Sequence, residues 1–144
     1  INVRTHLKTV PATALDPVQL RSAILNIIRN AMDAMPGGGR LDVDLHSRGD
    51  WIELAFKDTG CGIPHEVQAR LFTAFFTTKP SGAGLGMFIV QRIMHALGGG
   101  VRVQSEEGRG TEVILDLPVR GHVQPRSLPS PFELDEHEEN HSHH

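Results

Sequence analysis

The sequence has little cysteine, no long apolar run and no excess of basic residues, and each absence narrows what the chain can be. Cys61 is the single cysteine among 144 residues, which excludes an internal disulfide framework and fits a reducing compartment. No apolar run approaches the roughly 20 residues of a membrane-spanning helix, and no signal-like stretch opens the chain. We therefore expect a soluble, cytoplasmic chain. Because it begins with Ile1 rather than methionine, we expect a fragment of a longer protein, whose own membrane attachment stays open.

Charge is distributed unevenly along the chain. The net charge is −3, but residues 121–144 carry one arginine against five acidic residues, which leaves residues 1–120 with a net charge of +1. Neither part has the basic excess of a nucleic-acid-binding protein. The segment 121–144 begins rich in proline and continues acidic and rich in histidine, a composition that cannot bury a core. The composition predicts one domain at residues 1–120, followed by a flexible tail.

Hydrophobic periodicity predicts a mixed domain of helices and strands. Asp16 followed by Pro17 is a strong helix start, and Pro36 with three glycines is a strong helix stop. The predicted helices cover residues 16–35, 65–72 and 85–97, and the predicted strands cover residues 1–7, 41–45, 51–56, 101–105 and 111–117. Strands and helices mixed in this way predict an α+β fold, a two-layer α/β sandwich in which helices cover one face of a sheet.

One stripe of the predicted helix 16–35 carries polar residues that are poor helix formers. Asn26, Asn30 and Asp33 recur at i, i+4 and i+7, on the stripe opposite the apolar face. A solvated face is the simpler interpretation, but such faces favour Glu, Lys, Gln and Arg because Asn and Asp lower helix stability. An Asn carbonyl oxygen is a hard, neutral ligand that suits Mg²⁺, with phosphates and water filling the other positions. The helix alone leaves both interpretations open.

A glycine-rich turn at residues 58–62 follows directly after a predicted strand. Gly60 and Gly62 permit backbone angles that are closed to other residues and let a flat ligand approach the main chain. A carboxylate such as Asp58 accepts a hydrogen bond from the amino group of adenine, whereas guanine presents a carbonyl oxygen at the same position. The turn favours an adenine nucleotide, although an ordinary Asp-Gly turn between two elements has the same sequence pattern.

A second glycine cluster, Gly82, Gly84 and Gly86, leads into the last predicted helix. The free N–H groups and the dipole of a helix start attract phosphate. The pattern is neither the P-loop motif nor the dinucleotide G-x-G-x-x-G motif. Before it, residues 72–80 hold three phenylalanines in a loop, which suggests a lid that docks over a filled site. Lys79 in this loop is either a ligand for a terminal phosphate or a solvated lysine.

These segments, in this order, resemble the catalytic ATP-binding domain of sensor histidine kinases. That domain falls within the superfamily that includes gyrase-type, mismatch-repair and heat-shock-chaperone ATPases. The resemblance covers residues 1–119 and rests on five boxes: N at 26–35 (NIIRNAMDAM), G1 at 58–63 (DTGCGI), F at 71–79 (LFTAFFTTK), G2 at 82–87 (GAGLGM) and a last glycine box at 108–111 (GRGT). It implies the Bergerat fold, with a mixed, mostly antiparallel sheet of about five strands and about three helices on one face. The T-T-K ending and the short lid are similar to those of nitrogen-regulation-type kinases, whereas Ala74 stands where this box usually has proline.

The resemblance also implies cofactors and roles for individual residues. The cofactors are ATP and Mg²⁺. Asn26, Asn30 and Lys79 are the candidate catalytic residues, and Asn30 matches the asparagine that chelates Mg²⁺. Asp58 matches the adenine-binding aspartate, and Thr111 matches the threonine that supports it, commonly through water. The candidate nucleotide-binding residues are Asn26, Asn30, Asp33, Asp58, Gly60, Gly62, Ile63, Phe72, Thr78, Lys79, Gly82, Gly84, Leu85, Gly86 and Thr111.

Asn26 distinguishes a kinase from a hydrolase in this resemblance. The ATPase branches of the superfamily place a glutamate one turn before the Mg²⁺ asparagine, as the general base for water. An asparagine cannot accept a proton at neutral pH, so we expect slow ATP hydrolysis. The site then positions the γ-phosphoryl group for another acceptor, for which the neutral imidazole of a histidine is suited.

The acceptor histidine is not expected within this chain. In the family it lies on an upstream helical dimerisation domain, and nothing in residues 1–15 resembles its H box. The expected partners are the protein's own dimerisation domain and a response regulator, without nucleic-acid or membrane contact, and the isolated domain is expected to be a monomer. Two other functions share these boxes: a nucleotide-binding regulatory module without transferase activity, and a serine kinase of the anti-sigma type. A gyrase- or repair-type ATPase is disfavoured by Asn26 and the short lid.

Overall fold

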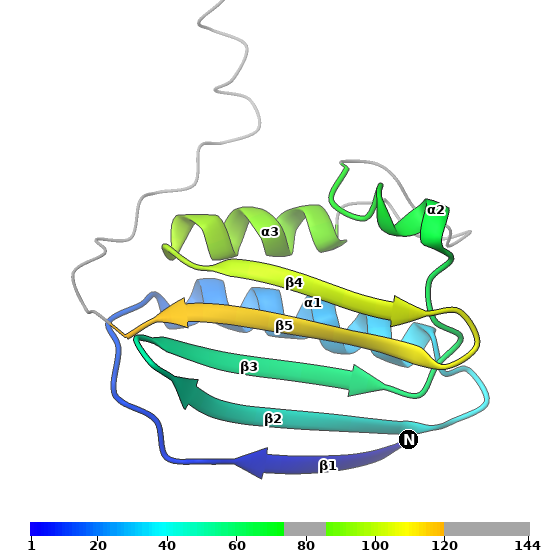
Figure 1. The fold of residues 1–144 in the computed structure, drawn as a ribbon, viewed down its shortest axis with the longest axis horizontal. Coiled ribbons are helices and arrows are strands. Elements are labelled where there is room, and N and C mark those ends of the chain that lie inside the picture. The colour runs from blue at the N-terminus through cyan, green and yellow to red at the C-terminus, as the bar shows by residue number, and fades with distance from the viewer. Residues whose placement is uncertain (74–85, 120–144) are drawn as a thin grey trace, which may run out of the picture.

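The computed structural model describes residues 1–73 and 86–119 (Figure 1). The described elements are β1 (Asn2–Leu7), α1 (Pro17–Asp33), β2 (Arg40–Arg48), β3 (Trp51–Asp58), α2 (His65–Gln68), α3 (Gly86–Ala96), β4 (Gly100–Glu106) and β5 (Gly110–Pro118). The predicted tail at 121–144 lies outside the described residues, as do the candidate residues Thr78, Lys79, Gly82, Gly84 and Leu85.

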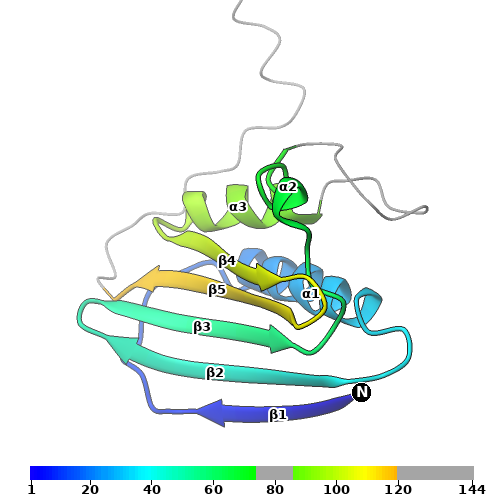
Figure 2. The same cartoon turned by 45° about the vertical axis from the view of Figure 1, so that its right-hand side comes forward.

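The five strands form one mixed sheet in the order β1-β2-β3-β5-β4 (Figure 2). β1 and β2 are parallel, because the chain passes through α1 between them, and the other neighbouring pairs are antiparallel. The predicted α+β sandwich is confirmed. The insertion of β5 between β3 and β4 brings the end of β3 and the start of β5 to the same end of the sheet.

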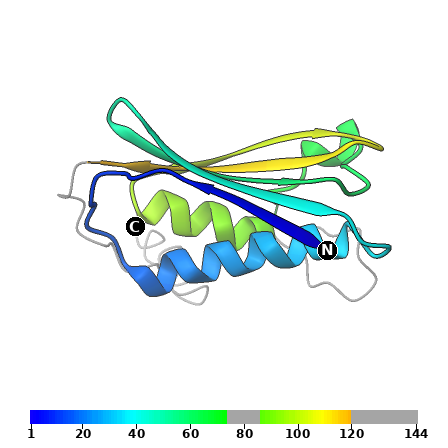
Figure 3. The same ribbon diagram turned by 90° about the horizontal axis from the view of Figure 1, so that it is seen from below.

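The two long helices α1 and α3 cover one face of the sheet (Figure 3). Every second strand residue points toward them, and burial follows that alternation in β3, whereas in β5 Ile114 is buried as well. The core is aliphatic apart from two methionines and one phenylalanine, and its members are Ala23, Ile27, Ala31, Met35, Leu41, Ile52, Phe56, Val90, Ile93, Met94, Leu97, Val113, Leu115 and Leu117. Burying each large apolar side chain contributes roughly 1.5–3 kcal/mol, so this layer fixes both helices on the sheet.

The start of α1 follows the sequence prediction. The side chain of Asp16 accepts a hydrogen bond from the Val18 N–H at 2.9 Å, and Pro17 occupies the first helical position. The helix ends at Asp33, two residues before the predicted end. Among the described residues, no helix is both long and apolar enough to span a membrane.

The short helix α2 is less regular than predicted. Regular helix stops at Gln68, and the chain continues through turns in which the Arg70 and Thr73 N–H groups bond to carbonyls three residues earlier. Gln68 itself contacts the end of β4, so α2 lies at the end of the sheet where β3 ends and β5 begins.

Candidate functional site

Asp58 is the last residue of β3 and is buried, with 7% of the residue exposed. Its Oδ1 accepts two backbone hydrogen bonds, from Gly60 at 2.9 Å and from Thr111 at 3.2 Å. Within residues 1–73 and 86–119, the structure contains no hydrogen bond to Oδ2. The carboxylate is therefore fixed through one oxygen, and the other remains available to accept from a ligand.

The turn that follows Asp58 is held against α1. The Cys61 N–H donates to the carbonyl of Ala34 at 3.2 Å, just beyond the end of the helix. A Cβ placed on Gly60 would lie 2.6 Å from that same carbonyl oxygen, so only glycine allows this approach. The packing of the turn against α1 therefore requires glycine at position 60.

The same turn is held on its other side by the hairpin between β4 and β5. The Gly108 N–H donates to the Cys61 carbonyl at 2.7 Å. Gly62 has φ +71°, and a Cβ there would collide with the carbonyl of Glu106. Both predicted glycines of the turn are required for close backbone approach.

Ser105 is a component of this region that the sequence prediction missed. Its Oγ accepts from the Ile63 N–H at 2.8 Å and lies 2.8 Å from Thr111 Oγ1 and 3.1 Å from the Gly110 carbonyl oxygen. Gln68 donates to the carbonyls of both Ile63 and Ser105, at 2.8 and 3.0 Å. Only the register could have indicated Ser105, because it lies directly opposite Thr111 in the β4–β5 pair.

Asn26 and Asn30 lie beside the first residue of α3. A Cβ placed on Gly86 would lie 3.6 Å from Asn30 Nδ2, 3.7 Å from Asn30 Oδ1 and 3.8 Å from Asn26 Oδ1. Asn26 also donates to the Ser22 carbonyl at 2.8 Å. Two amide side chains therefore lie next to the glycine that opens α3.

This placement corrects the predicted geometry of α1. The asparagines are half-buried and lie on the flank of the helix that faces α3. The most exposed large apolar side chains of α1 are instead Val18, Leu25 and Met32, at intervals of seven residues. The sequence predicted that the asparagines lie opposite the apolar face, because a helical wheel contains no information about the neighbouring helix α3.

The candidate residues fall into two groups along α1. Asp58, Gly60, Gly62, Ile63 and Thr111 gather at the turn near its C-terminal end, and Asn26, Asn30 and Gly86 gather one to two turns earlier. From Asn26 to Ala34 the helix rises by about 12 Å. Asp33 is exposed on the last turn of α1, and Phe72 is half-buried after α2.

A metal at this site would rely on amide oxygens. No group of three or more His, Cys, Asp or Glu residues that could hold a metal ion occurs in the described part of the chain. The Asn30 carbonyl oxygen, beside a residue without a side chain, fits one position on a Mg²⁺ ion that takes its other ligands from phosphates and water.

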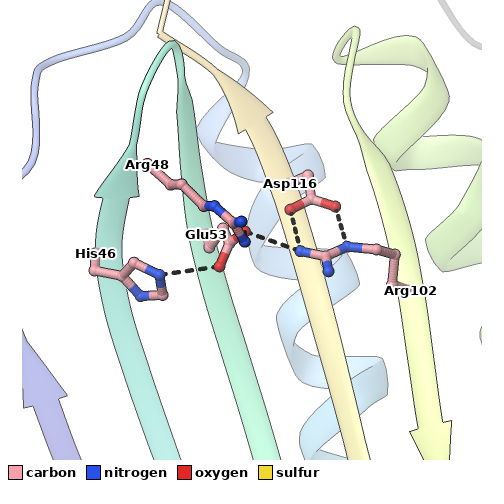
Figure 4. Close-up of polar contacts among 5 residues, drawn as sticks. All are labelled: His46, Arg48, Glu53, Arg102 and Asp116. Carbon is pink, nitrogen blue, oxygen red and sulfur yellow. Dashed lines mark hydrogen bonds and ion pairs between the residues drawn. The ribbon is translucent and has the colours of Figure 1, made fainter.

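The opposite face of the sheet carries a separate charged cluster (Figure 4). Arg102 binds Asp116 through two bonds of 2.8 Å and Glu53 through one of 3.0 Å, and His46 contacts Glu53 at 2.9 Å. The hydrogen bond to Asp116 raises the pKa of Arg102, and the attraction of Asp116 and Glu53 adds to it. A cavity of about 460 Å³ lies at this cluster, on the face of the sheet away from Asp58. It is lined by Arg48, Trp51, Glu53, Gly99, Gly100, Arg102 and Asp116.

The family model described as "Histidine kinase-, DNA gyrase B-, and HSP90-like ATPase" matches residues 15–121. Sporulation kinase E of Bacillus subtilis is 36% identical over 118 residues, which are 81% of this chain and 16% of that protein. Sensor histidine kinase ZraS of Escherichia coli K12 is 36% identical over 111 residues, which are 77% of this chain and 24% of that protein. The chain thus spans a quarter or less of these two relatives.

Solved structures share the fold. The mycobacterial sensor histidine kinase MprB aligns with a TM-score of 0.74 at 32% identity, over 83% of both chains. Full-length ShkA in complex with AMPPNP also aligns with a TM-score of 0.74, at 31% identity, over 87% of this chain and 27% of ShkA.

Proposed function

Because the chain belongs to the family of histidine kinase-, DNA gyrase B- and HSP90-like ATPases, we propose that it binds Mg-ATP and donates the γ-phosphoryl group to a histidine. The acceptor lies on a separate dimerisation domain of the same sensor kinase, and the phosphoryl group then passes to a response regulator. The observation that carries this proposal is that the turn after Asp58 is hydrogen-bonded to the end of α1, the helix that carries Asn30. On the same helix, Asn26 stands where a hydrolase would have glutamate.

The base is recognised at the turn after β3. Oδ1 of Asp58 already accepts two N–H groups, so Oδ2 is the atom that accepts from the amino group of adenine. A guanine base would present a carbonyl oxygen to the same carboxylate, which repels it. Burial of Asp58 strengthens this discrimination because water competes poorly there.

The phosphates extend from that turn along α1 toward Asn30 and the start of α3. Asn30 would hold Mg²⁺, which neutralises phosphate charge when it is bound. The N–H groups and the dipole at the start of α3 favour the same phosphates. Asn26 orients the γ-phosphoryl group but takes no proton from water.

The transfer itself requires an imidazole supplied by the other domain. A nitrogen lone pair of the neutral imidazole forms a bond to the γ-phosphorus, and the bond from that phosphorus to the β–γ bridging oxygen breaks. ADP leaves with that electron pair, and the imidazole loses its N–H proton to solvent. The contribution of this chain is to position the nucleotide and stabilise its charge.

Transfer in trans tests the proposal. The chain is mixed with γ-labelled ATP, Mg²⁺ and a separately expressed dimerisation domain bearing the acceptor histidine. We expect label on that domain in an acid-labile, alkali-stable form, and none when the acceptor histidine is replaced by alanine. ATP binding without any transfer would instead support a regulatory nucleotide-binding module, and acid-stable label on serine would support a serine kinase.

A further inference from the structure

The hydroxyl of Ser105 joins two segments of the chain that form the adenine end of the proposed site. It accepts from the Ile63 N–H at 2.8 Å, and it lies 3.1 Å from the Gly110 carbonyl oxygen and 2.8 Å from Thr111 Oγ1. Ile63 belongs to the turn that follows Asp58, whereas Gly110 and Thr111 open β5. Ser105 thus bonds to both segments, as the carboxylate of Asp58 also does through the N–H groups of Gly60 and Thr111.

Counting protons limits how these contacts coexist. A serine hydroxyl has one proton and two lone pairs, and the Ile63 N–H uses one lone pair. If Ser105 donates to the Gly110 carbonyl, it must accept the proton of Thr111. If Ser105 donates instead to Thr111 Oγ1, the Thr111 hydroxyl can donate its own proton to another acceptor. Either hydroxyl can be the donor in the 2.8 Å contact.

The choice between these arrangements determines what Thr111 offers to a base. The N–H of Thr111 bonds to Asp58 Oδ1, which places the residue beside the carboxylate. Next to its amino group adenine carries N1, an acceptor, so a donor beside the carboxylate complements adenine, directly or through water. A Thr111 that has already donated to Ser105 presents only lone pairs to N1 and cannot make that bond.

We propose that Ser105 is a positioning residue for nucleotide recognition: it donates to Thr111 and thereby directs the Thr111 proton toward adenine N1. Ser105 does not touch the nucleotide. Binding of adenine selects this arrangement of the two hydroxyl protons, and the Ile63 N–H holds Ser105 in place for it. The inference rests on the proposed binding of Mg-ATP, and it adds a residue that acts through Thr111.

A double-mutant cycle measures this dependence. Dissociation constants for Mg-ATP are determined for the wild type, Ser105→Ala, Thr111→Val and the double variant. Thr111→Val removes the proposed hydrogen bond to N1, and Ser105→Ala removes the donor that orients the Thr111 hydroxyl, so each should weaken binding roughly five- to tenfold. Because Ser105 acts through Thr111, the double variant should bind at least threefold more tightly than the product of the two losses predicts. A coupling below threefold would overturn the inference.

A nucleotide analogue provides the second readout. 1-Deaza-ATP lacks the N1 acceptor but retains the amino group. Ser105→Ala should weaken Mg-ATP more than Mg-1-deaza-ATP, whereas a merely structural role would weaken both equally and contradict the inference. Ser105→Thr keeps the hydroxyl and should restore the wild-type ratio. Ser47→Ala, an exposed serine near the end of β2, is the matched control and should change neither constant.

Folding and the parent proposal are tested separately. Thermal unfolding without nucleotide shows whether Ser105→Ala is folded, and Ser105→Cys, whose thiol is a weak donor and acceptor, replaces it in the cycle if it is not. A wild-type chain that does not bind Mg-ATP defeats the proposed function and this inference together. A wild type that binds, combined with additive losses, defeats only the role of Ser105.

Discussion

The backbone N–H of Thr111 donates to the Oδ1 of Asp58 at 3.2 Å, which links the start of β5 to the end of β3 across 53 positions of sequence. The Gly60 N–H binds the same oxygen at 2.9 Å. The orientation of the Asp58 carboxylate is therefore set by main-chain groups before any ligand arrives. A preset acceptor of this kind suits selective recognition of one base, because little ordering is needed on binding.

Asp58→Asn should weaken ATP binding and reduce selectivity for adenine. The two backbone donors will hold the Asn oxygen in the place of Oδ1, so the NH₂ group replaces Oδ2 and meets the adenine amino group, donor against donor. We expect an affinity loss of roughly tenfold to a hundredfold, measured by calorimetry, and a smaller preference for ATP over GTP. Asp44→Asn, on the other face of the sheet, is the control and should leave both quantities unchanged.

Gly60→Ala should destabilise the fold as well as the site. A Cβ there would lie 2.6 Å from the Ala34 carbonyl oxygen and 2.8 Å from the Ala34 Cβ, so the turn must move away from α1. Overpacking of this kind typically costs about 1–3 kcal/mol of unfolding free energy, measurable by urea denaturation. Gly37→Ala has nothing within 4 Å and should change stability little. Equal stability of the two variants would mean that the turn is not packed against α1 as described.

Asn26→Glu should convert the slow wild-type reaction with water into a faster one. The wild type lacks a base at this position, whereas a glutamate beside Gly86 and Asn30 can accept a proton from water. Single-turnover phosphate release with Mg-ATP should rise by at least about tenfold, a modest part of what a positioned base contributes. In Asn26→Gln the side chain has nearly the same size as glutamate but is not a base, so phosphate release should stay slow. Fast, Mg²⁺-dependent release by the wild type would contradict this account of Asn26.

Arg102→Met should lower stability without affecting nucleotide binding. Arg102 joins β4 to Asp116 of β5 and Glu53 of β3, but its side chain is 46% exposed, so solvent screens these pairs. We expect a loss of about 1 kcal/mol, smaller in high salt. Arg48→Met is the control. The Arg48 side chain is 78% exposed and its contact with Glu53 is longer, at 3.8 Å, so the substitution should change stability little. A change in ATP affinity in Arg102→Met would mean that the two faces are coupled.

Much of the fold follows from local sequence signals. The Asp16-Pro17 start of α1 and the alternation in β2 and β3 were sufficient to predict those elements, because capping and burial act within a few residues. β2 extends beyond its predicted end, to Arg48. In this extension His46 pairs with Glu53 of β3 and contacts its carboxylate, so the strand continues through a polar contact rather than through apolar burial.

The parts that local signals could not supply depend on contacts distant in sequence. The insertion of β5 between β3 and β4 brings Thr111 to Asp58, and the β4–β5 register brings Ser105 to Thr111. The tight approach of Gly60 to Ala34 likewise depends on how the turn meets α1. Sequence patterns identified Asp58 and Asn30 as candidates, but they gave no reason to single out Ser105.

The central claim is that the region from Asp58 to Asn30 binds Mg-ATP, and mapping the bound nucleotide on the chain tests it most directly. Backbone and side-chain amide resonances are followed by nuclear magnetic resonance while Mg²⁺ and a non-hydrolysable ATP analogue are added. The account predicts saturable shifts at Asp58, Gly60, Thr111 and the side-chain amides of Asn26 and Asn30. Shifts gathered instead around Trp51 and Arg102, beside the cavity on the opposite face, would contradict it.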